Sequence, residues 1–305
     1  MSKIKIVSDS TSDLSKELLE RYNVSVLPLH VLLGDNEYKD GVNLGPDEIY
    51  KWADENKDTP KTSAPSPADT IEFFKKYLEE YDEIIAFHIS GSMSSSGQIM
   101  QLAAEELDAE DRIHVIDSKN LSTGIGHLVV EAAEMAAKGL PAIEIKDEIL
   151  KLRPYVRSSF VVDTLTYLHR GGRCSGLAAL AGGVLKLHPR IAVADGAMHP
   201  EKKYRGKINT AVMDYVKDME ADLKKAKPDR VFITHSGCDA EVVENVRSYL
   251  AGLNIFKEIF ETRAGSVISS HCGPGTLGVL YIEQAQEELT RSAKKTEFKG
   301  RTGSF

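Results

Sequence analysis

The chain has 305 residues, of which 42% are hydrophobic and 28% are charged, and its formal net charge is −8. This length suits one large or two medium domains and is sufficient to bury a sizeable core. An acidic protein repels phosphate backbones, so nucleic-acid binding is disfavoured as a main task, and no apolar run reaches the roughly 18 residues of a membrane span.

The first half alternates between expected strands and helices. The expected strands are Ile4–Val7, Val24–Leu33 with an interruption at Pro28, Glu83–Ile89 and Ile113–Ile116. The expected helices begin at Ser12, after Gly45-Pro46, at Ala68, after Gly97 and at Leu121, with a Pro/Ser-rich loop over Thr59–Pro67. Such alternation predicts a parallel sheet covered by helices.

The second half starts with an expected strand over Ser158–Val162 and a short helix that ends at Gly171-Gly172. Asp195-Gly196 predicts a β-hairpin turn, and a helix is expected over Asn209–Lys225. Further α/β elements follow up to Phe260. We therefore expect an α/β fold of two domains, residues 1–152 and 153–290, with a polar tail over 291–305.

The three cysteines, Cys174, Cys238 and Cys272, lie far apart and form no Cys-x-x-Cys pair. An odd number of unpaired cysteines suits a reducing compartment. The first residues also lack the apolar core of a signal peptide. These features predict a cytoplasmic location.

The first polar motif is the loop Lys61-Thr62-Ser63-Ala64-Pro65-Ser66-Pro67. Its prolines stiffen a loop that carries three hydroxyl groups, which suits contact with a small anion. The alternative is a plain helix entry with Ser66 as the N-cap.

The second polar motif, Ser90–Gly97, follows an expected strand and precedes a helix. Ligands of parallel sheets bind at the carboxyl ends of strands, and a helix start offers unpaired backbone N–H groups to a carboxylate or phosphate. The motif is neither a Walker loop nor a nucleophile elbow, and the alternative is a flexible βα loop.

The third polar motif leads from Gly265 through His271 to the turn Gly273-Pro274-Gly275, which we expect to open a helix. A histidine here can donate a hydrogen bond to an anion, and the glycines allow a ligand close to the backbone. The alternative is a structural histidine.

Two basic features complete the set. Arg173 follows Gly171-Gly172, and residues 202–207 form the basic run Lys-Lys-Tyr-Arg-Gly-Lys. Such a run is either a solvated surface or a docking patch for an acidic partner.

These motifs, in this order, resemble the DegV family of fatty-acid-binding proteins. The resemblance rests on Ser8-Asp9-Ser10-Thr11, the Thr62 loop, the Ser90 loop with Gln98, Leu165-x-Tyr167-Leu168-x-x-Gly171-Gly172-Arg173, and His271-x-Gly273-Pro274-Gly275. It extends from Ile4 to Glu283, which is nearly the whole chain.

The resemblance implies that the protein binds a long-chain fatty acid, such as palmitate or stearate, with its carboxylate near the domain interface. The ligand-binding residues would be Thr62, Ser63, Ser94, Ser95, Arg173, His271 and Gly273. It also implies delivery of the fatty acid to an ATP-dependent fatty acid kinase, which forms acyl phosphate for phospholipid synthesis. Arg205 and Arg173 would dock the kinase. No cofactor, metal or catalytic residue is implied, and membrane contact would be transient at most.

The chain departs from the family pattern in the second motif. The family commonly has Leu-Ser-Gly-Thr-Tyr-Gln, whereas this chain has Met93-Ser94-Ser95-Ser96-Gly97-Gln98. Because a tyrosine is replaced by Gly97, we expect a more open loop.

The apolar run from Ala178 to Leu185 is expected to line a tunnel for the acyl chain, or to be a packed core helix. Two other functions stay open: an acyl hydrolase that uses Ser94 and His271, or an enzyme like the dihydroxyacetone kinases, in which His271 would hold the substrate. A regulator or scaffold without a ligand is a third, and we expect a monomer.

Overall fold

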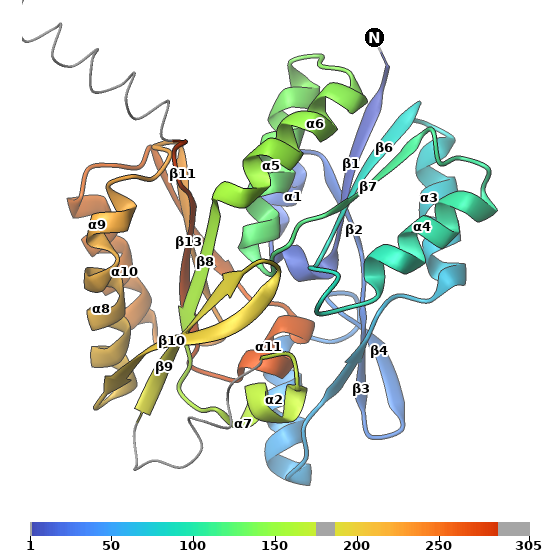
Figure 1. The fold of residues 1–305 in the computed structure, drawn as a ribbon. Coiled ribbons are helices and arrows are strands. Elements are labelled where there is room, and N and C mark those ends of the chain that lie inside the picture. The colour runs from blue at the N-terminus through green and yellow to red at the C-terminus, as the bar shows by residue number, and fades with distance from the viewer. Residues whose placement is uncertain (1, 175–186, 286–305) are drawn as a thin grey trace, which may run out of the picture.

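A computed structural model describes residues 2–174 and 187–285, which form three β-sheets flanked by helices (Figure 1). The α/β fold class predicted from the sequence is confirmed. Within these two described ranges, no helix has both the length and the apolar character needed to cross a bilayer. The expected tunnel lining over 178–185 and the expected tail over 291–305 lie outside the described residues.

The first sheet is parallel throughout, with the order β2-β1-β6-β7. Its strands are β1 (Ile4–Asp9), β2 (Val24–Leu27), β6 (Glu83–His88) and β7 (Ile113–Asp117). Helices α3 (Pro67–Leu78) and α4 (Ser96–Glu106) cover one face, and α5 (Thr123–Ala137) and α6 (Ala142–Leu152) cover the other. The short α1 (Lys16–Arg21) precedes β2.

The second sheet is mixed, with the order β10-β9-β8-β13-β11-β12. Only its β11–β12 pair is parallel. Its strands are β8 (Val156–Val161), β9 (Leu187–Ala194), β10 (Ala197–Arg205), β11 (Arg230–His235), β12 (Glu258–Arg263) and β13 (Leu277–Ile282). One face is covered by α8 (Ile208–Asp218), α9 (Glu220–Leu223) and α10 (Ala240–Gly252).

Helix α5 is the layer that the two large sheets share (Figure 1). Residues Thr123 to Ala133 are all buried, as expected for a helix that is apolar around most of its circumference. One side of α5 packs against β1 and β6, and another against β8 and β13. The chain after β7 therefore joins the two sheets into one hydrophobic core.

The third sheet is small and antiparallel, with the order β4-β3-β5. It consists of β3 (His30–Leu33), β4 (Asn36–Lys39) and β5 (Lys61–Ser63). Helices α2 (Pro46–Asn56) and α11 (Ser266–Cys272) pack around it, and α11 contacts both β3 and β5. This packing brings the third polar motif of the sequence against the first.

Several local expectations are confirmed. Strands β9 and β10 form the predicted hairpin, with Asp195 and Gly196 at its tip. Helix α7 (Thr166–Gly171) ends at Gly172, whose φ of +66° is the left-handed conformation that glycine tolerates best. The division into domains at residue 152 stays a prediction. It falls between α6 and the first strand of the second sheet.

Other expectations are wrong in detail. Gly273-Pro274-Gly275 does not open a helix; it ends α11 and leads into β13, because Gly273 has a φ of +75°. The expected helix at Ser12 begins later, at Lys16, since Ser15 accepts a hydrogen bond from the Leu18 amide and acts as the N-cap. The expected loop over Thr59–Pro67 contains β5, and the expected helix over Asn209–Lys225 is split into α8 and α9.

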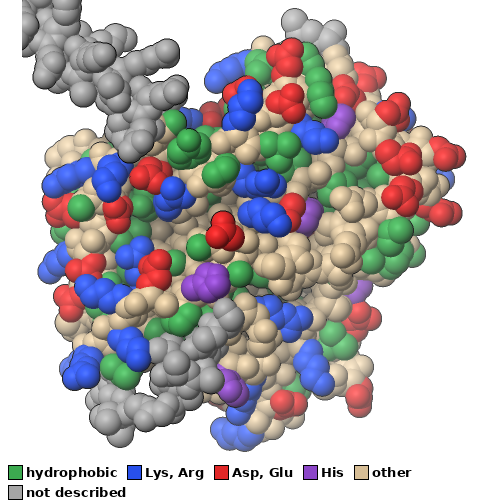
Figure 2. Space-filling model, in the orientation of Figure 1, with side chains coloured by type: hydrophobic (Ala, Val, Ile, Leu, Met, Phe, Trp, Pro, Cys, Tyr) green, Lys and Arg blue, Asp and Glu red, His purple; other side chains and the backbone are tan. Residues whose placement is uncertain are grey.

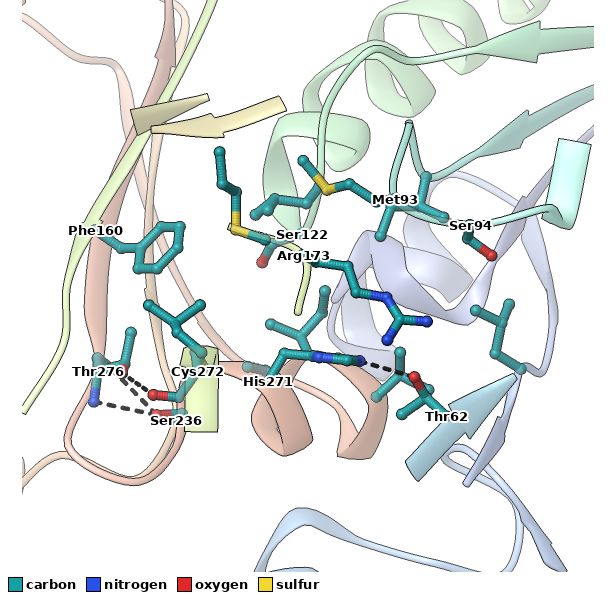
Figure 3. Close-up of a pocket in the computed structure, with 18 of the residues that line it drawn as sticks. Thr62, Met93, Ser94, Ser122, Phe160, Arg173, Ser236, His271, Cys272 and Thr276 are labelled. Carbon is teal, nitrogen blue, oxygen red and sulfur yellow. Dashed lines mark hydrogen bonds between the residues drawn. The ribbon is translucent and has the colours of Figure 1, made fainter. Parts of the chain in front are cut away.

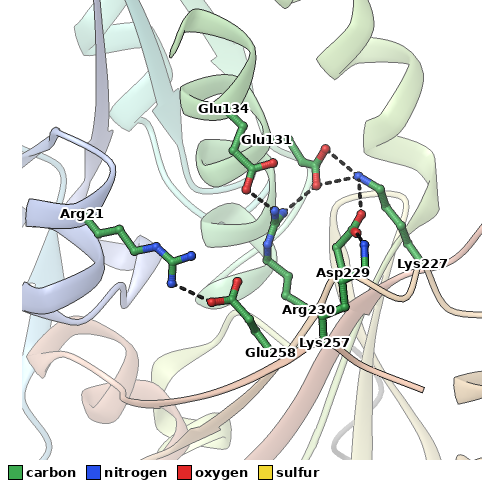
Figure 4. A network of polar contacts seen from close by, with 8 residues as sticks. All are labelled: Arg21, Glu131, Glu134, Lys227, Asp229, Arg230, Lys257 and Glu258. Carbon is green, nitrogen blue, oxygen red and sulfur yellow. Dashed lines mark hydrogen bonds and ion pairs between the residues drawn. The ribbon is translucent and has the colours of Figure 1, made fainter. Parts of the chain in front are cut away.

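At the end of the interface where β11 begins, a network of ion pairs joins α5 to the second sheet (Figure 4). Arg230 contacts Glu131 over 2.5 Å and also pairs with Glu134, while Lys227 contacts Glu131 over 2.7 Å and Asp229 over 3.2 Å. Arg21 of α1 pairs with Glu258 over 2.7 Å at the rim. The ion pairs with Lys227 and Arg230 lower the pKa of Glu131, although its burial alone would raise it.

On the face drawn in Figure 2, basic and acidic side chains mix over most of the surface and acidic ones gather at the right edge, while hydrophobic side chains lie between them in small groups. A protein that tracks a phosphate backbone needs a continuous basic surface instead.

Candidate functional site

A mainly apolar cavity of about 250 Å³ lies where the two large sheets and the small sheet meet (Figure 3). This is far more than the roughly 30 Å³ that one water molecule occupies, so the cavity accepts many ligand atoms. Its apolar walls come from the second sheet, from α7 and α11, and from the loops beside strands of the other two sheets: Leu29, Ile89, Met93, Leu121, Phe160, Leu168, Met198, Val267, Ile268 and Leu280. Six of the seven predicted ligand-binding residues line it: Thr62, Ser63, Ser94, Ser95, Arg173 and His271.

The polar centre of the cavity is the pair Thr62 and His271. The Thr62 Oγ1 and His271 Nε2 atoms are 2.7 Å apart, although the residues are 209 positions apart in the sequence. Strand β5 supplies the threonine and α11 supplies the histidine. Burial of the ring lowers the pKa of His271 to about 4, and the positive charge of Arg173 acts in the same direction. The histidine is therefore neutral near pH 7.

Arg173 brings a positive charge to the same cavity. It follows the Gly171-Gly172 end of α7, and its side chain donates a hydrogen bond of 2.7 Å to the Gly171 carbonyl. In Figure 3 the guanidinium points toward the Thr62–His271 pair. The side chain is exposed, so its charge is available to an anion at the cavity and is also screened by solvent.

Ser94 lines the same cavity from the loop just before α4. Its Oγ accepts a hydrogen bond of 3.2 Å from the Ser96 amide and lies 2.9 Å from the Ser96 hydroxyl. Ser95 directly precedes α4, where the first backbone N–H groups of a helix have no partner within the helix. Both serines line the cavity, so this loop adds uncharged donors to those on β5 and α11.

The expected opening of this loop at Gly97 is wrong. Gly97 is buried, and a Cβ placed on it would lie 2.3 Å from both Cε1 and Nε2 of His88. The imidazole of His88 therefore packs closely against the glycine, and its Nδ1 lies 2.6 Å from the Ile89 carbonyl. The glycine that replaces the family's tyrosine makes room for a buried histidine.

The tip of the β9–β10 hairpin also holds this loop. Ser92 donates a hydrogen bond from its hydroxyl to the Gly196 carbonyl, and a Cβ on Gly196 would lie 2.6 Å from the Ser90 hydroxyl. Met198, two residues beyond Gly196, lines the cavity. The hairpin thus contacts the Ser94 loop and forms part of the cavity wall.

Ser122 is a cavity residue that the sequence analysis missed. Its hydroxyl donates a hydrogen bond of 2.5 Å to the buried carboxylate of Asp13, and its backbone has an unusual φ of +51°. Burial raises the pKa of Asp13 well above its ordinary value. A signal was available, because Ser122 follows β7 at the same sheet edge as Ser90.

A second group of polar residues lines the opposite wall: Thr234, His235, Ser236, Cys272 and Thr276. Thr234 pairs with the hydroxyls of Thr123 and Thr262, whereas Ser236, Cys272 and Thr276 bond to one another and to the backbone. Thr276 donates from Oγ1 to the Cys272 carbonyl over 2.9 Å, and the Thr276 amide donates to the Ser236 hydroxyl over 3.1 Å. Burial raises the pKa of Cys272 to about 12, so its thiol stays protonated and is a poor nucleophile.

Two predicted site residues lie elsewhere. Gly273 ends α11 beneath the ring of Tyr167, where a Cβ would lie 2.5 Å from the tyrosine Cδ2, and it is not among the described residues that line the cavity. Arg205 is exposed at the end of β10 and also lies outside this lining. In the same basic run, Lys202 pairs with Asp218.

The geometry gives little support to the hydrolase alternative. A serine nucleophile needs a histidine within hydrogen-bond reach, but Ser94 bonds to Ser96 while the Nε2 atom of His271 bonds to Thr62. Across the described part of the chain, no group of three or more His, Cys, Asp or Glu residues is arranged to hold a metal ion.

Comparison with known proteins gives one consistent family. A family model described as "Uncharacterised protein, DegV family" matches residues 3–284. A DegV domain-containing protein of Clostridium perfringens is 33% identical over 284 residues, which cover 93% of this chain and 100% of the relative.

Comparison with solved structures points to the same family. A DegV family protein from Thermus thermophilus, described as fatty-acid binding, matches with a TM-score of 0.85 and 34% identity over 92% of this chain and 100% of its own. A stearic-acid-binding protein from Eubacterium ventriosum matches with a TM-score of 0.79 and 28% identity over 92% of this chain and 98% of its own.

Proposed function

Because this chain belongs to the DegV family, we propose that it binds a long-chain fatty acid such as palmitate or stearate and holds its carboxylate at Thr62 and His271. The observation that carries the proposal is an apolar cavity that contains a hydrogen-bonded threonine and neutral histidine. Related proteins of known structure are described as binding fatty acids, which supports the same ligand class.

The size of the hydrophobic effect is compatible with this ligand. A saturated sixteen-carbon acid buries about fourteen CH₂ groups at roughly 0.8 kcal/mol each, which gives about 11 kcal/mol before costs. Association and chain ordering cost several kcal/mol, so the expected Kd lies in the micromolar to nanomolar range.

The carboxylate needs hydrogen-bond donors, because a buried unpaired anion is costly. Thr62, Ser63, Ser94 and the Ser95 amide are the proposed donors, with His271 behind Thr62. Arg173 adds long-range attraction from the exposed side of the cavity. We propose no direct ligand contact for Gly273, which instead fixes the end of α11.

Native mass spectrometry of the protein purified from cells tests the ligand class. We expect a bound mass that matches a C14–C18 fatty acid. Protein that carries no fatty acid, and that neither binds added palmitate nor is stabilised by it, would contradict the proposal.

We further propose that the protein is cytoplasmic and presents the bound acid to an ATP-dependent kinase for acyl-phosphate formation, with Arg205 and Arg173 as docking residues. Since Arg205 is exposed and lies apart from the described cavity wall, Arg205→Ala should leave fatty-acid binding unchanged and slow phosphorylation several-fold. Arg21→Ala is the matched control, because it also removes one arginine charge, but at the rim of the ion-pair network. An unchanged phosphorylation rate for Arg205→Ala would contradict docking at this residue.

A further inference from the structure

The second ring nitrogen of His271, Nδ1, has an unusual environment. Nδ1 is buried and has no hydrogen-bond partner within residues 2–174 and 187–285. Opposite this nitrogen lies Gly171, the last residue of α7, which packs against α11.

Three distances define the direction of this contact. A Cβ built on Gly171 would lie 2.3 Å from Nδ1, 3.2 Å from Cε1 and 3.3 Å from Cγ. Cε1 and Cγ are the two ring atoms bonded to Nδ1. A Cβ above the ring face would lie closer than this to Cε1 and Cγ. The Cβ position therefore lies near the ring plane, on the outward axis of Nδ1. That axis carries either the Nδ1 hydrogen or its lone pair.

In glycine, a hydrogen bonded to Cα occupies the direction of the missing Cβ. A hydrogen bonded to Nδ1 would point directly at this hydrogen of Gly171. A lone pair on Nδ1 instead accepts a weak C–H contact. The packing therefore excludes a proton on Nδ1, and the ring hydrogen belongs on Nε2. The lowered pKa of His271 agrees with a ring that stays neutral.

We propose that Gly171 is a positioning residue that fixes His271 in its Nε2–H tautomer, so that the Thr62 hydroxyl becomes a hydrogen-bond donor to the cavity. With the hydrogen on Nε2, the histidine donates to Thr62 Oγ1 over 2.7 Å. The threonine then directs its own hydrogen elsewhere, and Thr62 lines the cavity. The identity of the acceptor, an ionised carboxylate, rests on the proposed function.

The glycine has no other evident advantage at this position. Gly171 is the last helical residue of α7 and its φ is not positive, so alanine would suit the backbone better. The next residue, Gly172, is the opposite case, with a φ of +66° and no described atom within 4 Å of a Cβ placed on it. Gly172→Ala is therefore a control that strains the same helix end without touching His271.

The tautomer can be measured without a ligand. Long-range ¹H–¹⁵N spectra of fatty-acid-free protein with labelled histidine should show, for His271, a protonated Nε2 and an unprotonated Nδ1 near pH 7. A protonated Nδ1 would overturn the inference even if fatty acid binds well. A protein with the expected tautomer that binds no fatty acid would overturn the proposed function alone.

Substitutions test the consequence for binding. Gly171→Ala should weaken palmitate binding about tenfold or more, the scale of one hydrogen bond to a charged group, while Gly172→Ala stays within about threefold of the unaltered protein. His271→Gln places an amide near the Nε2 position and should retain more affinity than His271→Asn, whose amide lies near the Nδ1 position. Unchanged binding in Gly171→Ala, or higher affinity in the Asn variant, would overturn the inference. If Gly171→Ala does not fold, the tautomer spectra and the Gln/Asn pair decide.

Discussion

The two ends of the interface around α5 contain different kinds of polar groups. At the end where β11 begins, three cations and three carboxylates form one balanced network, and the separate pair Arg21–Glu258 lies at its rim (Figure 4). At the end where β11 finishes, the cavity is lined mainly by apolar side chains and uncharged hydroxyls, with two histidines, His235 and His271, whose pKa is lowered by burial, and one exposed arginine. Strand β11 connects them directly, from Arg230 to His235.

The two ends differ in the cost of leaving a buried polar group without its partner. Arg230 and Glu131 are only 5% and 7% exposed, so neither charge can lose its partner without a large desolvation cost. Hydroxyls and a neutral imidazole leave no buried formal charge behind when a ligand departs. We therefore expect the network to set the stability of the fold, and the cavity to set ligand binding.

The largest expected effect is at the network. Arg230→Met should lower the free energy of unfolding by about 3–5 kcal/mol, because Glu134 loses its buried partner and the buried Glu131 is left with Lys227 alone. Arg21→Met, at a side chain that is 48% exposed, should cost only about 0–1 kcal/mol. Urea unfolding of both variants measures the difference, and equal costs would remove the distinction between core and rim of the network.

A buried histidine beside the network gives the next effect. His127 Nε2 bonds to the Leu280 carbonyl over 2.9 Å, and burial lowers the pKa of His127 to about 4. Between pH 6.5 and 4 the unfolded chain therefore binds a proton that the folded chain does not, so stability falls as the pH falls. A shift of this size corresponds to about 3 kcal/mol.

His127→Gln isolates this contribution, since Gln can donate to the same carbonyl without titrating. The comparison is needed because burial raises the pKa of Asp9, Asp13 and Asp40, which favours the folded state at low pH. Between pH 7 and 4, the unaltered protein should lose about 3 kcal/mol more than the variant. If the free energies of unfolding of the two proteins change in parallel with pH, the pKa of His127 is not lowered in the folded state.

At the cavity, the effect should appear in binding. Thr62→Val removes one hydroxyl at constant shape and should weaken palmitate binding by about 1.5–3 kcal/mol, roughly tenfold to a hundredfold. Its free energy of unfolding should change much less than that of Arg230→Met. Thr164→Val is the control, because that hydroxyl bonds to Thr166 outside the described cavity lining. Equal affinities of the two variants would remove Thr62 from the site.

The smallest effect should be at Gly97, where a methyl group meets the buried His88 ring. Gly97→Ala should cost about 1–3 kcal/mol of stability by overpacking, and it should weaken binding through the shifted Ser94 loop. Gly252→Ala, with no described neighbour within 4 Å of the added Cβ, should cost nothing comparable. If both variants are equally stable, His88 moves aside easily.

The sequence predicted the local features of this architecture. The alternation of strands and helices, the hairpin at Asp195-Gly196 and the end of α7 at Gly172 all follow from short-range chemistry. The grouping of Thr62, Ser94, Arg173 and His271 came from a family resemblance, and the cavity lining brings these residues together.

Features that depend on distant contacts were missed. Strand β5 has three residues and exists because β3 pairs with it, which no local pattern indicates. The ion-pair network joins residues about a hundred positions apart, such as Glu131 and Arg230. The position of His88 under Gly97 likewise depends on how β6 and α4 pack, so the loop was wrongly expected to open.

The most direct test of the central claim is the infrared spectrum of palmitate labelled with ¹³C at its carboxyl group and bound to the protein. We predict the band of an ionised carboxylate near neutral pH, shifted from that of free palmitate and shifted again by Thr62→Val. The band of a protonated acid, or a carboxylate band that Thr62→Val leaves unchanged, would contradict a carboxylate held by the Thr62 hydroxyl.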